Sequence, residues 1–237
     1  LILDVAKKDN RIRAVLLNGS RANPTAGKDS FQDFDIVYVV EEPDSFLKDH
    51  SWIDMFGERI ILQMPDQMEM VKTESANHSF SYLMLFKDKN RIDLTLFPLD
   101  KLAKEFERDS LTITLLDKDE LFSNVPRPSD SDYRVKRPTE KDFAECCNEF
   151  WWVCTYVAKG LARKEIIYAK DILKKPVRDM FLKIIEWHIG IETDFTASFG
   201  KSGKNMQAHL SPELYERILS TYPDAEAEEI WKSLIKM

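Results

Sequence analysis

Cysteine is scarce in this sequence, and the few that occur lie close together. The 237 residues include three cysteines, Cys146, Cys147 and Cys154, all in one segment with helical character. An odd number without paired metal-ligand spacing argues against a disulfide framework and against a zinc site. We therefore interpret them as small apolar core residues of a protein in the reducing cytoplasm.

The sequence also has no long apolar run and no excess of basic residues. No apolar stretch approaches the ~20 residues that a membrane-spanning helix needs, and we expect no secretory signal. Asp and Glu number 41 against 34 Lys and Arg, which gives a net charge of −7. Nucleic-acid-binding proteins normally carry a basic patch, whereas an acidic protein attracts cationic ligands. We expect neither a membrane nor a nucleic-acid partner.

The most informative stretch runs from Val15 to Val40. It predicts a buried strand, a Gly-Ser-Arg turn, a polar connection and a second strand from Asp33 to Val40. Alternate strand residues point to the same face, so Asp33 and Asp35 lie side by side. Neighbouring carboxylates repel each other, and a Mg²⁺ ion, which prefers oxygen ligands and substrate phosphates, would explain their placement.

The turn that precedes these acids suits a phosphate group. Gly19 lets the backbone approach closely, and Ser20 adds a hydroxyl donor to the backbone N–H groups. A phosphate cradle beside a metal site is the predicted arrangement. The plainer alternative is a hairpin whose acidic residues only cap and solubilise a turn.

This stretch resembles the nucleotidyltransferase signature of the DNA polymerase β-like superfamily. The longer run GSRANP…FQDFDIVYVV resembles the bacterial aminoglycoside 6-adenylyltransferases, which inactivate streptomycin. The resemblance implies a third carboxylate on a later strand, and RIDLTLF places Asp93 there. Asp93 is either a metal ligand or the general base that deprotonates the attacking hydroxyl. On composition alone, its strand face of Arg, Asp and Thr is equally typical of a solvated edge strand.

The pattern of the chain predicts two domains of an α/β (α+β) protein. Residues 1–125 form a nucleotidyltransferase domain with a mixed sheet, and the Pro- and Ser-rich segment 126–138 forms a linker. Residues 139–237 form a helical bundle for the substrate, truncated at its C-terminus because the last helix lacks a stop signal. The predicted active site lies in the cleft between the domains. Segments of the second half, such as EWHIGIETDF and SFGKSGKN, resemble the same family.

Several details of the helical half follow from spacing at three and four residues. A first helix carries an apolar stripe that includes Phe143, Cys147, Phe150, Trp151, Cys154 and Val157. A later helix has Pro176 in its first turn, His188 in the core and Gly190 at its end. Thr221 and Asp224 approximate a capping box for the last helix, with Pro223 in its first turn.

Polar residues of this half supply further candidates. Asp142, Glu145 and Glu149 line one helix face, where they would meet the cationic groups of an aminoglycoside or simply face solvent. Trp151 is a candidate wall of the drug pocket. Lys164, from a basic cluster, is a candidate partner of the nucleotide's phosphates.

The resemblance implies transfer of AMP from ATP to the 6-hydroxyl of streptomycin, with release of pyrophosphate and resistance to the antibiotic. Asp33 and Asp35 would hold Mg²⁺, and Gly19, Ser20 and Arg21 would hold the phosphates. Two alternatives remain open: a protein-modifying nucleotidyltransferase of the same fold, and a catalytically silent nucleotide-binding regulator.

Overall fold

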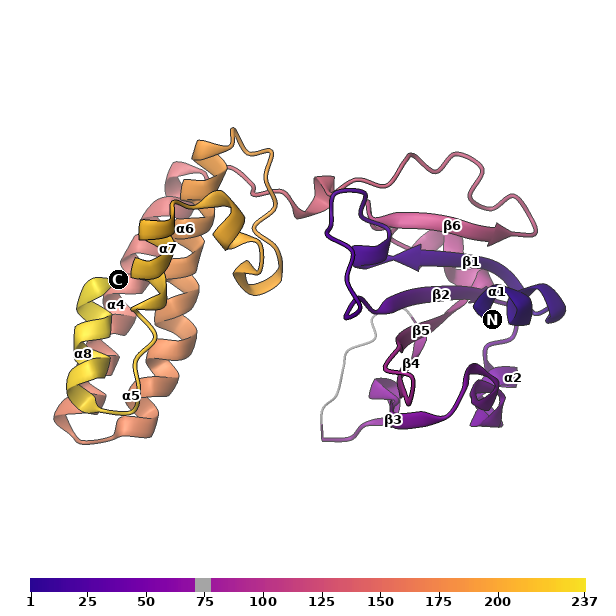
Figure 1. Ribbon diagram of the computed structural model, residues 1–237, viewed down its shortest axis with the longest axis horizontal. Helices are drawn as coiled ribbons and strands as arrows, with labels where there is room; N and C mark the ends of the chain where they lie inside the picture. Colours follow the sequence, from indigo (N-terminus) through magenta and orange to yellow (C-terminus); the bar gives the residue numbers. More distant parts are fainter. Residues whose placement is uncertain (71–77) are drawn as a thin grey trace. The chain divides into compact units, whose positions relative to one another are not determined.

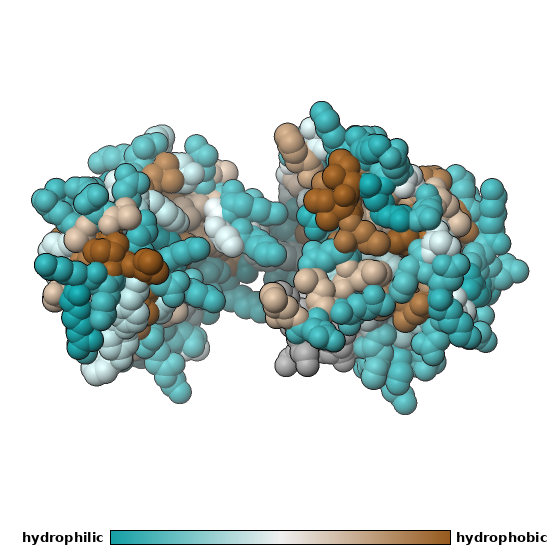
Figure 2. Space-filling model, turned by 90° about the horizontal axis from the view of Figure 1, so that it is seen from below, coloured by the Kyte–Doolittle hydropathy of each residue, from teal (hydrophilic) through white to brown (hydrophobic). Residues whose placement is uncertain are grey.

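The computed structural model describes residues 1–70 and 78–237, which form two compact units (Figure 1). The first unit is Leu1–Asp132 and the second is Tyr133–Met237. The division falls inside residues 126–138, for which a linker is predicted. Each unit has a hydrophobic core of its own. Hydrophilic residues cover much of the face shown in Figure 2, with smaller hydrophobic areas between them.

The first unit is built on a mixed, six-stranded sheet with the order β3-β4-β5-β2-β1-β6. β2 and β5 pair in parallel at its centre, whereas β1 pairs antiparallel with β2 and β6, and β4 with β3 and β5. The strands are β1 (Ile12–Asn18), β2 (Phe34–Val40), β3 (Arg59–Gln63), β4 (Phe80–Phe86), β5 (Arg91–Pro98) and β6 (Thr112–Asp117). The helices are α1 (Ile2–Lys8), α2 (Asp44–Leu47) and α3 (Leu102–Glu105).

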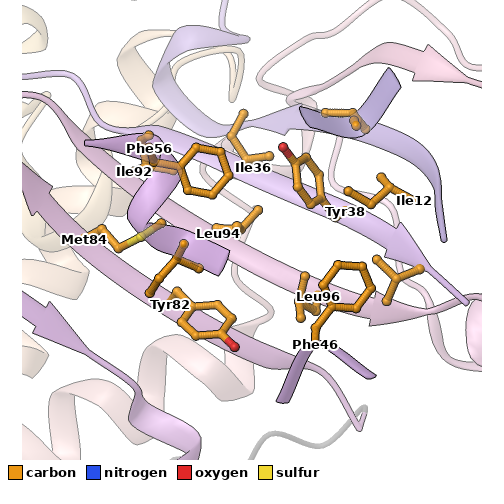
Figure 3. Close-up of a cluster of buried hydrophobic side chains, with 14 of the residues drawn as sticks. Ile12, Ile36, Tyr38, Phe46, Phe56, Tyr82, Met84, Ile92, Leu94 and Leu96 are labelled. Atoms are coloured by element: carbon orange, nitrogen blue, oxygen red, sulfur yellow. The ribbon is translucent and has the colours of Figure 1, made fainter. Parts of the chain in front are cut away.

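One face of this sheet carries the main core (Figure 3). Ile36 and Tyr38 of β2 lie beside Leu94 and Leu96 of β5, and all four are buried. Because side chains alternate along a strand, the residues between them point to the opposite face. Asp35 and Asp93 belong to that opposite set, so burial of the core positions both acids.

The second unit is helical, which completes the predicted α/β fold class. Its helices are α4 (Glu140–Ala162), α5 (Ile166–Ile172), α6 (Arg178–Glu192), α7 (Pro212–Leu219) and α8 (Ala227–Lys236). Thr139 and Asp142 form a reciprocal capping box at the start of α4. In the described ranges, no helix is both long enough and apolar enough to cross a membrane.

The predicted apolar stripe of α4 is correct in part, because Val157 is buried and Phe150 and Cys154 pack against the core. The structure buries Cys146, Val153, Val157 and Gly160, whereas Phe143 and Trp151 are exposed. A Cβ on Gly160 would lie 3.1 Å from the Cβ of Ala169, so the glycine permits close packing of α5. Counting large apolar residues overlooks such a contact between small residues.

Three predictions about the later helices are wrong. Pro176 lies inside a π-helical segment, Leu173–Val177, that joins α5 to α6 without a break. A wider turn tolerates the missing N–H of proline without ending the helix. His188 is exposed beside the buried Trp187. The helix also continues past Gly190 to Glu192.

Thr221 does not cap the last helix, because α8 begins only at Ala227. The Thr221 hydroxyl instead accepts a hydrogen bond from the buried guanidinium of Arg178 at 2.9 Å. The Arg178 guanidinium also lies 3.6 Å from the centre of the Tyr222 ring. These residues fix the segment between α7 and α8, which local sequence spacing does not indicate.

Candidate functional site

Gly19 places the end of β1 directly against an acidic side chain. It follows β1 with a φ of +72°, a conformation that side chains other than glycine rarely adopt. A Cβ built on Gly19 would lie 2.3 Å from Oδ2 of Asp35. The Gly19 N–H donates to the carbonyl of Leu111 at 3.1 Å, so this N–H is already used within the protein. The contribution of Gly19 to the site is therefore the space that its missing side chain leaves.

Asp35 and Asp93 are direct neighbours on the parallel strands β2 and β5. Adjacent strands lie about 4.8 Å apart, so both carboxylates leave the same face at the same level. Asp33 comes immediately before β2, which begins at Phe34 and not at Asp33 as predicted. The strand register therefore brings Asp35 and Asp93 together, and Asp33 lies two residues before Asp35.

Arg91 connects two of the three acids. Its Nε and one terminal nitrogen donate to the two oxygens of Asp93 at 2.8 and 2.7 Å. Its other terminal nitrogen lies 3.5 Å from Oδ2 of Asp33. The hydrogen bonds to Asp93, followed by the charges of Asp93, Asp33 and Asp35, raise the pKa of Arg91 above its usual value. Strand alternation predicts that Arg91 shares a face with Asp93, but the sequence alone did not indicate a role for Arg91.

Polar residues continue the row on β1 and β6. Asn18 pairs with Asp35 on one side and with Thr112 on the other. The hydroxyl of the buried Thr112 donates to Oδ1 of Asn18 at 2.8 Å. The row Thr112–Asn18–Asp35–Asp93 therefore crosses four adjacent strands. Sequence reasoning missed Asn18 and Thr112 because only the strand register reveals that they are neighbours.

Arg21 holds the connection that leads into the acids. Its Nε donates to the carbonyl of Asp33 at 3.0 Å, and a terminal nitrogen donates to the carbonyl of Gln32 at 2.8 Å. The guanidinium lies 3.7 Å from the centre of the Phe34 ring. The side-chain amide of Gln32 donates in turn to the carbonyl of Ser20 at 3.2 Å. These contacts tie the Gly-Ser turn to the backbone just before β2, and the predicted phosphate contact of Arg21 stays a prediction.

The donor set of this site is suited to a hard divalent cation. Asp33, Asp35 and Asp93 offer only carboxylate oxygens, which Mg²⁺ prefers. Within residues 1–70 and 78–237, however, no group of three or more His, Cys, Asp or Glu is arranged as a metal site. Asp33 and Asp93 face the Arg91 guanidinium instead. The three carboxylates fit a divalent metal by their chemistry, and in this structure Asp33 and Asp93 are paired with the guanidinium of Arg91.

The predicted drug-binding acids share a pocket of about 430 Å³ in the second unit. Asp142, Glu145 and Glu149 line it together with Met180 and Trp187. Three cationic residues line it as well: Lys136, Arg137 and Lys183. The pocket thus combines carboxylates, cations and an aromatic ring, which is a surface able to bind a polar, charged molecule.

The three acids of this pocket differ in how they are engaged. Asp142 accepts from the Thr139 N–H at 2.9 Å and from its hydroxyl at 2.7 Å. These bonds hold the pKa of Asp142 below its usual range. Glu145 lies 3.7 Å from Nζ of Lys141. Asp142 therefore caps the start of α4. Glu145 and Glu149 remain as the stronger candidates for contacting a ligand.

Trp151 and Lys164 lie outside that set of lining residues. Trp151 is 70% exposed, and its ring centre lies 5.3 Å from that of Phe150. Trp187 of α6 is the tryptophan that lines the pocket, seven residues after Met180 on the same helix face. Lys164 is exposed just after α4 with a φ of +62°. The functional roles predicted for Trp151 and Lys164 stay predictions.

Comparisons with known proteins identify the family. The model of the family described as streptomycin adenylyltransferase matches residues 1–237. An aminoglycoside 6-adenylyltransferase of Campylobacter jejuni is 47% identical over 98% of this chain and 80% of its own length. The Bacillus subtilis protein of the same name is 44% identical over 99% of this chain and 82% of its own length.

A crystal structure of a Bacillus subtilis aminoglycoside 6-adenyltransferase also matches, at 40% identity over 99% of this chain and 82% of that chain, with a TM-score of 0.44. The match to the family model spans the whole chain, and the two relatives cover nearly all of it. The resemblance of the Gly-Ser and Asp-x-Asp stretch is thereby confirmed. This chain is a nucleotidyltransferase that belongs to the streptomycin adenylyltransferase family.

Proposed function

We propose that this protein transfers AMP from ATP to the 6-hydroxyl of streptomycin and thereby confers resistance to it. The observation that carries the proposal is the register pairing of Asp35 with Asp93 beside the Gly19 turn. The name of the relatives, aminoglycoside 6-adenylyltransferase, supports the substrate class. We place the reaction in the cytoplasm, where ATP is available.

The reaction exchanges one phosphorus–oxygen bond for another. The drug's hydroxyl oxygen bonds to the α-phosphorus of ATP, the bond from that phosphorus to the bridging oxygen breaks, and pyrophosphate leaves. The proton of the hydroxyl passes to a carboxylate, for which Asp93 is the candidate. If Asp93 is a metal ligand instead, the proton leaves to another base. Gly19 and Ser20 accommodate the β- and γ-phosphates, and Lys164 is a candidate cation for them.

Asp33 and Asp35 would hold Mg²⁺, with Asp93 as the candidate third ligand. When bound, the ion would neutralise the phosphate charge that builds up during the transfer. The chain's own residues position these ligands: Arg21 fixes the backbone at Asp33, and Gly19 leaves room for the carboxylate of Asp35.

Pyrophosphate release tests this function. We expect release with ATP, Mg²⁺ and streptomycin, and none with kanamycin, spectinomycin or no drug. Release without any drug but with an added protein substrate would instead favour a protein-modifying enzyme. Absence of release under every condition would favour a silent nucleotide-binding regulator and contradict the proposal.

Removal of the charges of Glu145 and Glu149 from the acidic pocket of the second unit is expected to weaken drug binding. In the double variant Glu145→Gln, Glu149→Gln we expect KM for streptomycin to rise about tenfold while KM for ATP changes less than twofold, because two surface charges attract the cationic drug. Initial rates at varied drug and ATP concentrations measure both constants. Glu213→Gln, an exposed acid of α7 outside the set that lines this pocket, is the matched control. An unchanged KM for streptomycin in the double variant would remove these acids from the drug site.

A further inference from the structure

Arg91 is a cation placed among the acids to which the proposed function assigns a divalent metal. It occupies both oxygens of Asp93 through a two-pronged hydrogen bond and lies 3.5 Å from Oδ2 of Asp33. Asp93 and Arg91 belong to β5, but Asp33 precedes β2. The guanidinium therefore joins two neighbouring strands across the acidic site and is more than a local pair along one strand.

The acids have a physical reason to hold a cation when no metal is bound. Three carboxylates on one face repel each other, and the side chain of Asp93 is only 20% exposed, so water screens it incompletely. A guanidinium fork matches a carboxylate and satisfies both of its oxygens. Arg91 itself is 44% exposed, so its guanidinium has open space into which it can withdraw.

We propose that Arg91 is a built-in counter-ion that competes with the divalent metal for Asp33 and Asp93. The metal and the guanidinium require the same carboxylate oxygens, and their positive charges repel each other at this distance. Metal entry therefore requires Arg91 to release its hold. Because nucleotide phosphates add negative charge, the resting protein binds the metal weakly and the loaded protein binds it well.

This inference rests on the proposed function only in taking the three acids as the metal site. It assigns Arg91 a role that neither the resemblance nor the reaction requires: setting the metal affinity before ATP arrives. It also connects the two open roles of Asp93. As long as Arg91 donates to both its oxygens, the charge of Asp93 is compensated, which weakens the carboxylate both as a base and as a metal ligand.

The test measures metal affinity without nucleotide. Mn²⁺ is titrated into wild type, Arg91→Met and Arg91→Lys at low ionic strength, and free Mn²⁺ is followed by its electron paramagnetic resonance signal. We expect Arg91→Met to bind Mn²⁺ about tenfold more tightly than wild type, because methionine keeps the apolar stem without the charge. Arg91→Lys, which keeps the charge but loses the fork, should fall between them.

Arg13→Met is the matched control, because Arg13 is also ion-paired in the first unit but to Asp119 and Glu41. We expect its Mn²⁺ affinity to equal that of wild type. Equal or weaker binding by Arg91→Met would overturn the proposal and indicate that Arg91 positions Asp93. Two results would contradict the metal assignment and the counter-ion role together. One is that Mn²⁺ binds to none of the proteins. The other is that Asp33→Asn binds Mn²⁺ as tightly as Arg91→Met does.

Discussion

Replacement of Asp35 by asparagine is expected to reduce turnover with streptomycin at least about 10³-fold, which corresponds to ~4 kcal/mol of transition-state stabilisation. Asp35 lies at the centre of the polar row, between Asn18 of β1 and Asp93 of β5. Its Oδ2 lies against Gly19, the residue that turns the chain where the phosphates are proposed to bind. Asparagine keeps the shape of the side chain and removes the charge that the metal requires.

Stability distinguishes this loss from misfolding. Because Asp35→Asn removes one charge from a cluster of like charges, we expect the melting temperature of the variant to equal or exceed that of wild type. Mn²⁺ affinity should fall together with turnover. Asp100→Asn, an exposed acid just after β5, is the control and should keep full turnover. An Asp35→Asn enzyme with near-normal turnover would contradict the metal assignment.

The first unit could be predicted well from local sequence because alternation sets which residues face the core. Strand residues such as Leu94 and Leu96 point to the core and leave Asp93 on the other face, whichever strand is the neighbour. Which strand lies beside which is not a local property. The parallel pairing of β2 with β5 joins segments more than fifty residues apart, and it alone makes Asp35 and Asp93 neighbours.

The site residues that were not predicted were missed for the same reason, because strand order is not a local property of the sequence. Arg91 meets Asp33, and Thr112 meets Asn18, only because of that strand order. In the helical unit the errors have two sources: Gly160 of α4 lets α5 pack closely, and Trp187 lines the acidic pocket from a different helix, α6. Hydropathy ranks residues by size and polarity, so it cannot identify the face on which a glycine lets two helices approach.

Replacement of Gly19 by alanine is expected to reduce kcat/KM at least about 10²-fold and the free energy of unfolding by ~1–2 kcal/mol. Two independent effects act at this position. The φ of +72° costs an L-residue about 1 kcal/mol or more. The added methyl would also lie 2.3 Å from Oδ2 of Asp35, so that carboxylate has to move. A displacement of about 1 Å in a catalytic group is enough for a loss of this size.

Gly27→Ala is a closely matched control for that variant. Gly27 lies in the same connection between β1 and β2, its φ is not in the left-handed region, and a Cβ there would meet nothing within 4 Å. Steady-state kinetics and chemical denaturation of both variants should therefore show normal activity for Gly27→Ala, with a stability at or slightly above that of wild type. If both variants were equally impaired, flexibility of the whole connection would be the critical property. If neither were impaired, the contact between Gly19 and Asp35 would have no part in catalysis.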